Sequence, residues 1–230
     1  MEFDSFVLAA STADLDDEAA ARDDADAVEF RMDLADDPLA ALDDYDGTLP
    51  LLATNRATWE GGEADDEGRL AVLAEAVDHD AVEAVDVEAA CFEGRGGVDA
   101  AEADALREHA RESGVAVVAS VHDFEGTARP DALREQLSAA CDAGDVGKLA
   151  TTATDRGDAL ALLQATYAVA ADGGTPATMA MGEPGRHTRA VAPVYGSRIG
   201  YAPVDPADAT APGQYDLGTL RTLVDLLGGD

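Results

Sequence analysis

The chain contains a single lysine, and its neighbours in the sequence are apolar. Lys148 lies in the run Val-Gly-Lys-Leu-Ala, and all the other basic residues among the 15 are arginines. A primary amine can lose its proton and attack a carbonyl carbon, whereas a guanidinium stays charged. Burial would destabilise the ammonium and favour the nucleophilic amine. The placement predicts imine (Schiff-base) chemistry at Lys148; the alternative is a lysine whose stem lies along the core and whose ammonium reaches solvent.

A lysine can perform this chemistry only where a rigid element holds it, and the sequence predicts a regular series of such elements. Short apolar, β-branched stretches alternate with helical segments rich in Ala, Asp, Glu and Leu. Strands are expected at 3–9, 27–32, 49–54, 82–87, 115–121, 146–151, 177–181 and 194–200. Helices are expected at 16–24, 67–77, 100–112, 131–140, 156–171 and 217–227, with weaker patterns at 37–42 and 185–192.

Eight such units predict an α/β fold, the (β/α)8 TIM barrel. Near-continuous apolar strands are typical of a parallel sheet that helices cover, and eight right-handed crossovers close it. No linker interrupts the pattern, so we expect a single catalytic domain over residues 1–230. An open doubly wound sheet is the structural alternative, although neither a GxGxxG sequence after the first strand nor a Walker sequence occurs.

Ionisable residues recur where the predicted strands end, which is where barrel enzymes place their chemistry. Strand alternation puts Glu29 and Arg31 on one face. Further polar groups follow at the ends of the next strands: Thr54 and Arg56, then Glu60; Asp86 and Glu88; His122; and Lys148. Five successive strand ends therefore direct ionisable groups toward one mouth of the barrel.

The composition is strongly acidic. Asp and Glu number 48 and the formal net charge is -33, which should repel nucleic acid and anionic membranes. At molar salt the screening length falls to roughly 3 Å, so this surface is typical of a protein adapted to a salt-rich cytoplasm. The two cysteines form no CxxC and have no neighbouring His pair, so neither a disulfide framework nor a zinc site is predicted. With no apolar run of about 20 residues, we expect a soluble, cytoplasmic protein.

Eight short sequence blocks resemble one family, the type I 3-dehydroquinate dehydratases, and occur in that family's order. They are Glu-Phe-Arg-Met-Asp at 29–33, Thr-Asn-Arg at 54–56 with Glu-Gly-Gly at 60–62, Asp-Val-Glu at 86–88, Ser-Val-His-Asp-Phe at 120–124, Gly-Lys-Leu at 147–149, Met-Gly-Glu-Pro-Gly-Arg-His-Thr-Arg at 181–189, Tyr-Gly-Ser at 195–197 and Ala-Pro-Gly-Gln at 211–214. One block alone would be weak support, but eight in register make the resemblance strong.

The resemblance implies a catalytic group. Lys148 would form an imine with the ketone of 3-dehydroquinate, and His122 would act as general base and then as general acid for the departing hydroxyl. Glu60 would orient and charge His122. The residues alone support this pairing, because elimination beside a ketone needs an electron sink and a base of near-neutral pKa. The resemblance implies neither a metal nor a cofactor, and similar enzymes are often homodimers.

The resemblance also implies a substrate-binding set. Residue types alone offer Arg186, Arg189 and Arg198 as cations for the substrate carboxylate, and the resemblance selects Arg189. Groups expected near the ring hydroxyls are Glu29, Arg31, Arg56 and Gln214, with Met179 and Met181 as an apolar wall and Thr210 where the family usually has serine. For Arg31 an internal ion pair with Glu29 or Asp86 remains equally open. The Pro- and Gly-containing segment 205–214 is expected to form a lid over the ligand.

Three other functions remain open from the residues. A class I aldolase shares the barrel and the lysine chemistry but normally binds a phosphate. A metal-dependent barrel enzyme would use Asp86, Glu88 and His122 as ligands, with Lys148 polarising the substrate. A non-catalytic acidic protein that binds cations or a partner would not need an inward-facing Lys or His.

Overall fold

The computed structural model describes residues 1–205, 207 and 213–228. Within these residues eight strands form one sheet in the order β7-β6-β5-β4-β3-β2-β1-β8, and every pairing between them is parallel. The strands are β1 (Val7–Thr12), β2 (Ala27–Arg31), β3 (Leu51–Thr54), β4 (Val82–Glu88), β5 (Ala116–Asp123), β6 (Val146–Thr152), β7 (Pro176–Met181) and β8 (Ile199–Pro203).

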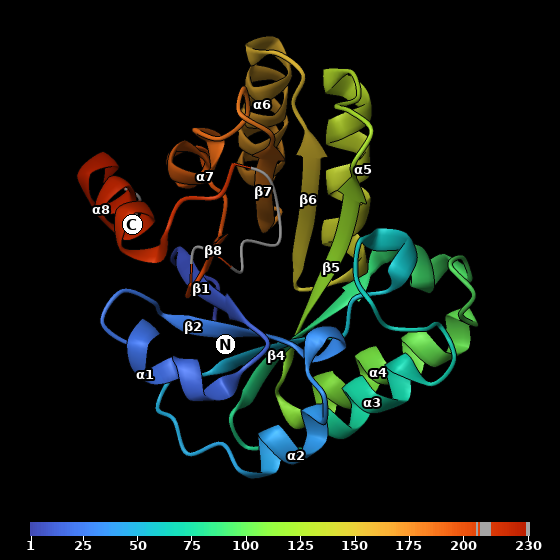
Figure 1. Cartoon of the computed structure of the whole chain (residues 1–230). Coiled ribbons are helices and arrows are strands. Elements are labelled where there is room, and N and C mark those ends of the chain that lie inside the picture. The colour runs from blue at the N-terminus through green and yellow to red at the C-terminus, as the bar shows by residue number, and fades with distance from the viewer. Residues whose placement is uncertain (206, 208–212, 229–230) are drawn as a thin grey trace.

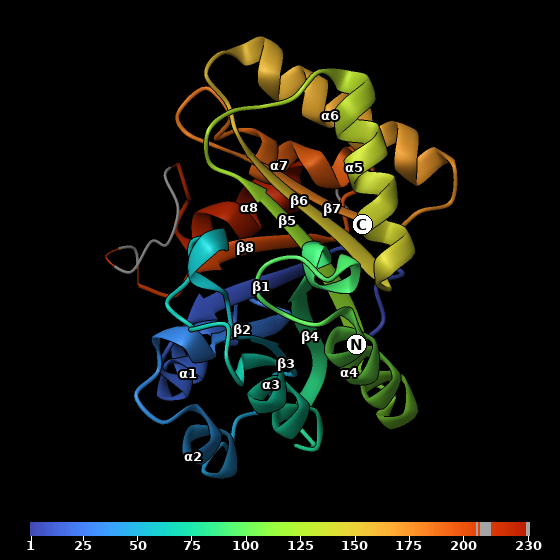
Figure 2. The same cartoon turned by 90° about the vertical axis from the view of Figure 1, so that its right-hand side faces the viewer.

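Helices connect the strands and lie around them, as Figures 1 and 2 show. The α-helices are α1 (Glu18–Ala21), α2 (Pro38–Asp43), α3 (Arg69–Val77), α4 (Ala100–Ser113), α5 (Pro130–Ala143), α6 (Arg156–Ala171), α7 (Thr188–Val191) and α8 (Leu217–Leu227). Short 3₁₀ helices add η1 (Leu15–Asp17), η2 (Met32–Leu34), η3 (Thr58–Glu60), η4 (Ala89–Glu93) and η5 (Ala192–Tyr195). The predicted (β/α)8 TIM barrel is confirmed.

The barrel closes between β7 and β8 with few backbone contacts. The backbone N–H of Arg198 donates to the carbonyl of Pro176 at 2.7 Å, and the N–H of Thr178 donates to the Ser197 hydroxyl at 2.9 Å. Buried backbone donors need partners, and here a serine side chain supplies one. The serine of the Tyr-Gly-Ser block therefore has a structural task, the closure of the barrel.

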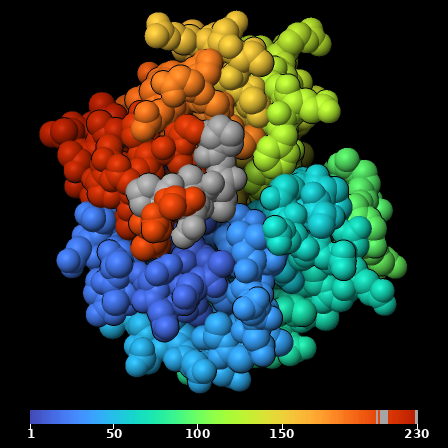
Figure 3. Space-filling model, in the orientation of Figure 1, coloured from blue at the N-terminus to red at the C-terminus, as the bar shows by residue number. Residues whose placement is uncertain are grey.

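Apolar side chains pack on both sides of the strands. Inside the barrel a cluster includes Leu52, Val118, Val146 and Ile199. Outside, three further clusters fill the space between the strands and the helices. A parallel sheet covered on both faces accounts for the continuous apolar strands of the sequence. In the space-filling view the N-terminal half and the C-terminal half meet across the middle of the molecule (Figure 3).

Some of the many aspartates stabilise helix ends. At the N-termini of five helices an aspartate side chain accepts a backbone N–H: Asp14, Asp37, Asp99, Asp155 and Asp216. Such caps each stabilise a helix by about 0.5–2 kcal/mol relative to alanine. The acidic composition thus serves local structure as well as the surface. None of the helices that the structure describes has the length and apolar character needed to cross a membrane.

The predicted first and last strands were placed wrongly. The expected strand at 194–200 is instead the 3₁₀ helix η5, a turn, and β8, which starts at Ile199. Pro193 lies in the first turn of η5, and Gly196 ends it with a φ of 98°, a conformation that strands do not use. At the other end, β1 is Val7–Thr12 and not 3–9, so its last residues are polar. The predicted helix at 16–24 is only the short pair η1 and α1.

Candidate active site

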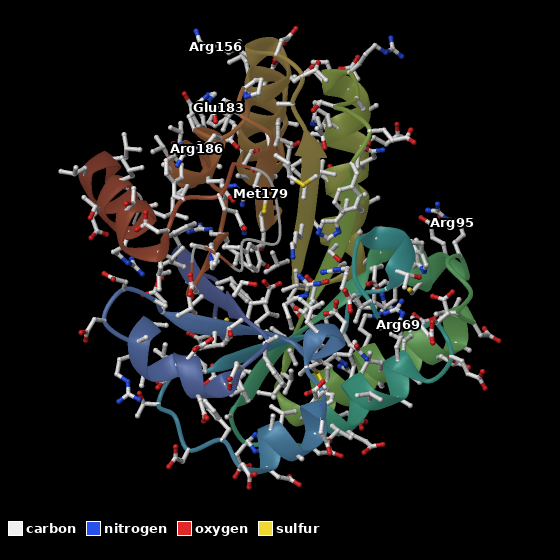
Figure 4. All side chains as sticks on the ribbon, viewed as in Figure 1. Arg69, Arg95, Arg156, Met179, Glu183 and Arg186 are labelled. Carbon is white, nitrogen blue, oxygen red and sulfur yellow. The ribbon has the colours of Figure 1, made fainter. Side chains whose placement is uncertain are left out.

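A cavity opens at the carboxyl ends of the strands, and ionisable side chains line it. About 580 Å³ of free space lies within it, a volume that includes open solvent at its mouth. Met179, on β7 and inside the ring of helices, is labelled in Figure 4, whereas Arg95 and Arg156 lie at the periphery. The lining residues are Glu29, Arg31, Thr54, Arg56, Glu60, Gly61, His122, Phe124, Lys148, Ala150, Met179, Met181, Arg189, Tyr201 and Gln214.

Strand register explains why these residues meet. Lys148 on β6 pairs with Ser120 on β5, which in turn pairs with Glu88 on β4. His122 pairs with Ala150, one step of the alternation closer to the strand ends. The lysine therefore rises from a deeper layer of the barrel, and the histidine lies in the layer above it.

Lys148 is buried and surrounded by groups that stabilise a cationic nitrogen. Only 4 % of the residue is exposed. Its Nζ lies 3.0 Å from Asp86 Oδ2 and 3.7 Å from Glu29 Oε1. The ring of Tyr201 completes the surroundings, with its centroid 4.1 Å from Nζ. The alternative of a lysine that reaches out to solvent is wrong.

Beneath the cavity, buried ion pairs fix the carboxylates that face Lys148. Arg56 contacts Asp86 at 2.8 Å and Glu88 at 3.1 Å. Arg69 contacts the other oxygen of Glu88 at 2.7 Å, and the Ser120 hydroxyl donates to Asp86 at 2.6 Å. Because each charge has a partner of opposite sign, the group is tolerated in the interior. Asp86 is held in place from two sides while its second oxygen faces the lysine.

Glu29 is held in the same manner by hydroxyl groups. The Ser11 hydroxyl donates to its Oε2 at 2.7 Å, and the Thr54 hydroxyl donates to Oε1 at 3.3 Å. Both hydroxyls come from strands next to β2. Glu29 is thus a rigid acceptor at the cavity wall, as the predicted substrate-binding role requires.

His122 pairs with Glu60 as predicted. Nδ1 of His122 lies 2.7 Å from Glu60 Oε2, and the ring of Phe124 stacks on the imidazole at a centroid distance of 6.0 Å. Glu60 comes from η3, in the connection after β3. Burial, together with the nearby Arg56 and Lys148 cations, lowers the pKa of His122 well below its usual value. The imidazolium is therefore disfavoured in the free enzyme.

The His122–Glu60 pair can carry one additional proton. The pH at which the pair loses this proton should set the acid limb of the activity profile. Burial raises the pKa of the Glu60 carboxyl to about 8. Loss of that proton leaves Glu60 ionised, Nδ1 protonated and Nε2 free to act as a base. A raised carboxyl pKa keeps the protonated pair populated at neutral pH, so we expect kcat/KM to fall as the pH drops below about 8.

A Glu60→Gln variant tests this assignment. Glutamine cannot ionise, so His122 alone would titrate, with its lowered pKa. The acid limb of kcat/KM should move to lower pH while the maximal rate falls. The pH profile of kcat/KM for both proteins measures the shift; an acid limb at the same pH in both would show that the pair does not control it.

Of the three candidate cations, Arg189 on α7 is the one that lines the cavity. Arg198 donates to the carbonyl of Asp4 at 2.6 Å, and the Arg186 guanidinium stacks on Tyr215 at 4.1 Å. Arg189 lines the cavity and is 4 % exposed. Among the described residues its Nε has no hydrogen-bond partner and the side chain forms no ion pair. Burial lowers the pKa of Arg189 to about 10, as expected for a buried cation without a paired anion among the described residues.

The remaining predicted residues divide into three cases. Arg31 lines the cavity, but its ion-pair partner is Asp33, at 2.8 and 2.7 Å, and neither Glu29 nor Asp86 as expected. Gln214 lines the cavity as predicted. Thr210 and much of the expected lid at 205–214 lie outside the described residues.

Tyr201 and Arg69 are among the residues of the site that the sequence analysis missed. Tyr201 was assigned to no element, because the predicted last strand ended at residue 200. Arg69 was counted as part of an ordinary helix, although its side chain is 1 % exposed and ion-paired to Glu88. The alternation of β8, with Ile199 and Tyr201 both inward, is the signal that could have found Tyr201. For Arg69 the sequence offers none.

Of the three ligands in the metal-dependent alternative, the two carboxylates are ion-paired with cations and His122 is paired with Glu60. Asp86 is paired with Arg56 and Lys148, and Glu88 with Arg56 and Arg69. Within residues 1–205, 207 and 213–228, no group of three or more His, Cys, Asp or Glu side chains is arranged to hold a metal ion.

Comparison with known proteins agrees with this site. The model of the family described as type I 3-dehydroquinase matches residues 6–230. The chain is 61 % identical to the 3-dehydroquinate dehydratase of Haloarcula marismortui, over the whole of both chains. It is 55 % identical to that of Halobacterium salinarum, over 97 % of this chain and 98 % of the other.

Solved structures give the same result. The 3-dehydroquinate dehydratase of Geobacillus kaustophilus superimposes with a TM-score of 0.84 at 27 % identity, over 98 % of this chain and 92 % of the other. That of Aquifex aeolicus has a TM-score of 0.79 at 25 % identity, over 96 % and 98 %. A barrel of this shape, a buried lysine beside a histidine–glutamate pair, and a family match along nearly the whole sequence lead to one conclusion: the chain belongs to the type I 3-dehydroquinase family.

Proposed function

We propose that this chain eliminates water from 3-dehydroquinate, giving 3-dehydroshikimate, through an imine on Lys148. The enzyme is a hydro-lyase of the type I 3-dehydroquinate dehydratase class. The neutral amine of Lys148 attacks the ketone carbon, and the carbinolamine loses water to give an iminium. His122 Nε2 then removes a proton from the neighbouring carbon, and the electrons of the C–H bond move into the iminium to form an enamine.

In the second half of the reaction the hydroxyl is eliminated and the iminium is hydrolysed. The enamine electrons then form the new carbon–carbon double bond and expel the β-hydroxyl, which takes a proton from His122 and leaves as water. Departure of the hydroxyl regenerates the iminium. Attack by water on the iminium then releases the product ketone and restores the Lys148 amine. One water is consumed by this hydrolysis, one was released on imine formation, and the eliminated hydroxyl leaves as the net water.

One arrangement carries the proposal. A lysine that is 4 % exposed, and a histidine hydrogen-bonded to a carboxylate, line the same cavity. The lysine supplies an electron sink and the histidine a proton carrier, which is what elimination beside a ketone needs. Arg189 is the cation for the substrate carboxylate, Met179 and Met181 form the apolar wall, and Glu29, Arg31, Arg56 and Gln214 bind the ring hydroxyls. Thr210, which lies outside the described residues, is assigned to the same substrate-binding set.

Reductive trapping tests the function directly. The protein in molar salt is mixed with 3-dehydroquinate and sodium borohydride, which reduces an iminium to a stable secondary amine. We expect a single covalent adduct, located by peptide mass mapping on the peptide that contains Lys148. An adduct on another peptide, or none while the enzyme turns over, would refute the imine mechanism.

We also propose that residues 1–230 form one catalytic domain in the cytoplasm, without nucleic-acid or membrane partners. The sheet supports a single domain, because β1 pairs with both β2 and β8 and so joins the two ends of the chain. The net charge of -33 supports a protein that works in a salt-rich interior and is repelled by polyanions.

We propose further that two copies associate through the outer face of α6. On this helix Leu160 is 66 % exposed and Tyr167 is 61 % exposed, with the uncharged Gln164 between them. Its one carboxylate, Asp158, caps the N-terminus. In a chain with 48 acidic residues, a helix face without carboxylates is where two copies can approach without charge repulsion. Val194 of the neighbouring η5, 51 % exposed, extends the apolar surface.

A Leu160→Asp variant should weaken this association. It places a carboxylate on each side of an apolar contact, so we expect the mass measured by sedimentation in molar salt to fall from a dimer to a monomer. Leu226→Asp on α8 is the matched control, because Leu226 is even more exposed, at 79 %. A monomeric parent protein, or a dimer that only the control disrupts, would contradict the proposed interface.

A further inference from the structure

Tyr201 occupies a central place in the site, and the reaction described above does not use it. It lies on β8 and points into the barrel, where 5 % of the residue is exposed. Its ring packs against the lysine nitrogen, with the centroid 4.1 Å from Lys148 Nζ. Such a contact favours a cationic nitrogen. A phenylalanine would supply the same contact, so the ring does not explain the hydroxyl.

The hydroxyl of Tyr201 is buried and, among the residues that the structure describes, has no hydrogen-bond partner. A buried polar group without a partner destabilises the folded state, and tyrosine hydroxyls usually find a partner when buried. Tyr45 shows the ordinary case in this chain, since its hydroxyl donates to the carbonyl of Leu49 at 2.7 Å. An unsatisfied hydroxyl at the wall of a substrate cavity indicates that a ligand supplies the partner.

The same cavity wall contains a second unsatisfied donor. Arg189 Nε is also buried without a partner within the described residues. Tyr201 and Arg189 both line the main cavity. Burial, and then the nearby carboxylates Glu29 and Asp86, raise the pKa of Tyr201 well above its usual value. The hydroxyl therefore keeps its proton and can act as a donor.

We propose that the Tyr201 hydroxyl is a substrate-binding group that donates a hydrogen bond to the carboxylate held by Arg189. This inference rests on the proposed function, because it takes a keto acid bound at Lys148 as the ligand. The ring of Tyr201 sets the position of the lysine nitrogen, and its hydroxyl sets the position of the acid group. One side chain thus fixes the distance between the reacting carbon and the carboxylate.

A Tyr201→Phe variant separates this role from a structural one, since the two make opposite predictions. If the hydroxyl serves the substrate, its removal raises KM about tenfold or more, the usual effect of losing a hydrogen bond to a charged group. It should change kcat little and leave the borohydride adduct at Lys148 intact at saturating substrate. Because an unsatisfied buried group is removed, the melting temperature of the ligand-free protein should stay the same or rise.

Tyr45→Phe is the matched control. It removes a hydroxyl that has a partner, and Tyr45 packs with the cluster between the strands and α2 and α3, away from the cavity. We expect it to lower the melting temperature and to leave KM unchanged. If Tyr201→Phe lowered the melting temperature as the control does, or left KM at the parental value, the proposal would be overturned.

The carboxylate assignment has its own test. Two donors to one carboxylate are coupled, so the effect of Tyr201→Phe on KM should shrink in an Arg189→Lys background. Effects that multiply independently would place the hydroxyl on another group and overturn the assignment. Failure of the proposed function is distinguishable: the parent protein would then neither turn over 3-dehydroquinate nor be trapped by borohydride, whereas failure of this inference leaves both intact.

Discussion

A Lys148→Met variant is expected to lose turnover of 3-dehydroquinate by more than about 10⁵-fold, since enzymatic accelerations begin near 10⁶-fold and covalent catalysis carries this one. Methionine fits the buried space but cannot form an imine. Without the iminium, the electrons of the broken C–H bond have no acceptor. The measurement is kcat in molar salt, together with borohydride trapping, which should yield no adduct.

The loss of activity in Lys148→Met must be distinguished from a loss of folding stability. In Lys148→Met the carboxylates of Asp86 and Glu29 lose a cation, and removing one partner of a buried ion pair typically costs about 3–5 kcal/mol. Asp86 keeps Arg56 and Ser120 as partners, which limits the damage. Lys148→Arg is the control, because it keeps the positive charge but stays protonated.

Both variants should be inactive, but Lys148→Arg should have the higher melting temperature of the two. Activity within about tenfold of the parent in either variant would mean that no covalent step at this residue is required. A folded but inactive arginine variant, by contrast, would assign the loss to the missing nucleophile, since charge and approximate size are preserved.

Local sequence pattern was sufficient to predict the barrel and the strand that carries Lys148. The alternation of apolar strands with helices set the order of the elements, and α6 and α8 begin and end at the predicted residues. Lys148 was singled out because it is the one lysine of the chain and lies in an apolar run, whereas the catalytic role of His122, at a polar strand end, was taken from the family resemblance. Their positions depend on the period of a strand and on adjacent registers, both of which short-range pattern determines.

The rest of the site depends on contacts between distant segments, which one sequence does not reveal. Asp33, and not Glu29 or Asp86, neutralises Arg31, because η2 turns the chain back immediately after β2. Arg69 reaches Glu88 across 19 positions of sequence, from a helix whose pattern looks ordinary.

Strand ends were the other source of error. The last strand was predicted at 194–200 because Val194 and Tyr195 favour a strand by residue type, but Pro193 and Gly196 enforce a turn there. Tyr201 was therefore left outside the predicted strand. Ser11 was missed in the same way. It lies in the second half of β1, and its hydroxyl holds Glu29. Polar residues at the carboxyl end of a strand look like loop residues in the sequence. The apolar pattern is therefore least informative at the strand ends that line the active site.

A His122→Asn variant should lower kcat by about 10²–10⁴-fold, the usual contribution of a general acid–base group. Asparagine is of similar size and can still hydrogen-bond to Glu60, but it cannot carry a proton. The loss should exceed that of Glu60→Gln, because Glu60 acts only through the imidazole. The measurements are kcat and its pH dependence, and the acid limb attributed to the pair should disappear.

Trapping distinguishes the histidine from the lysine. Imine formation needs the amine of Lys148, so the His122→Asn variant should still give the borohydride adduct at that residue, although more slowly because His122 also carries protons during imine formation. Slow proton removal should then let the substrate imine accumulate, and the trapped mass should be that of the reduced substrate and not of the product. If the variant gave only the product adduct, proton removal would not be its slow step, and another group in the cavity would have to be the base.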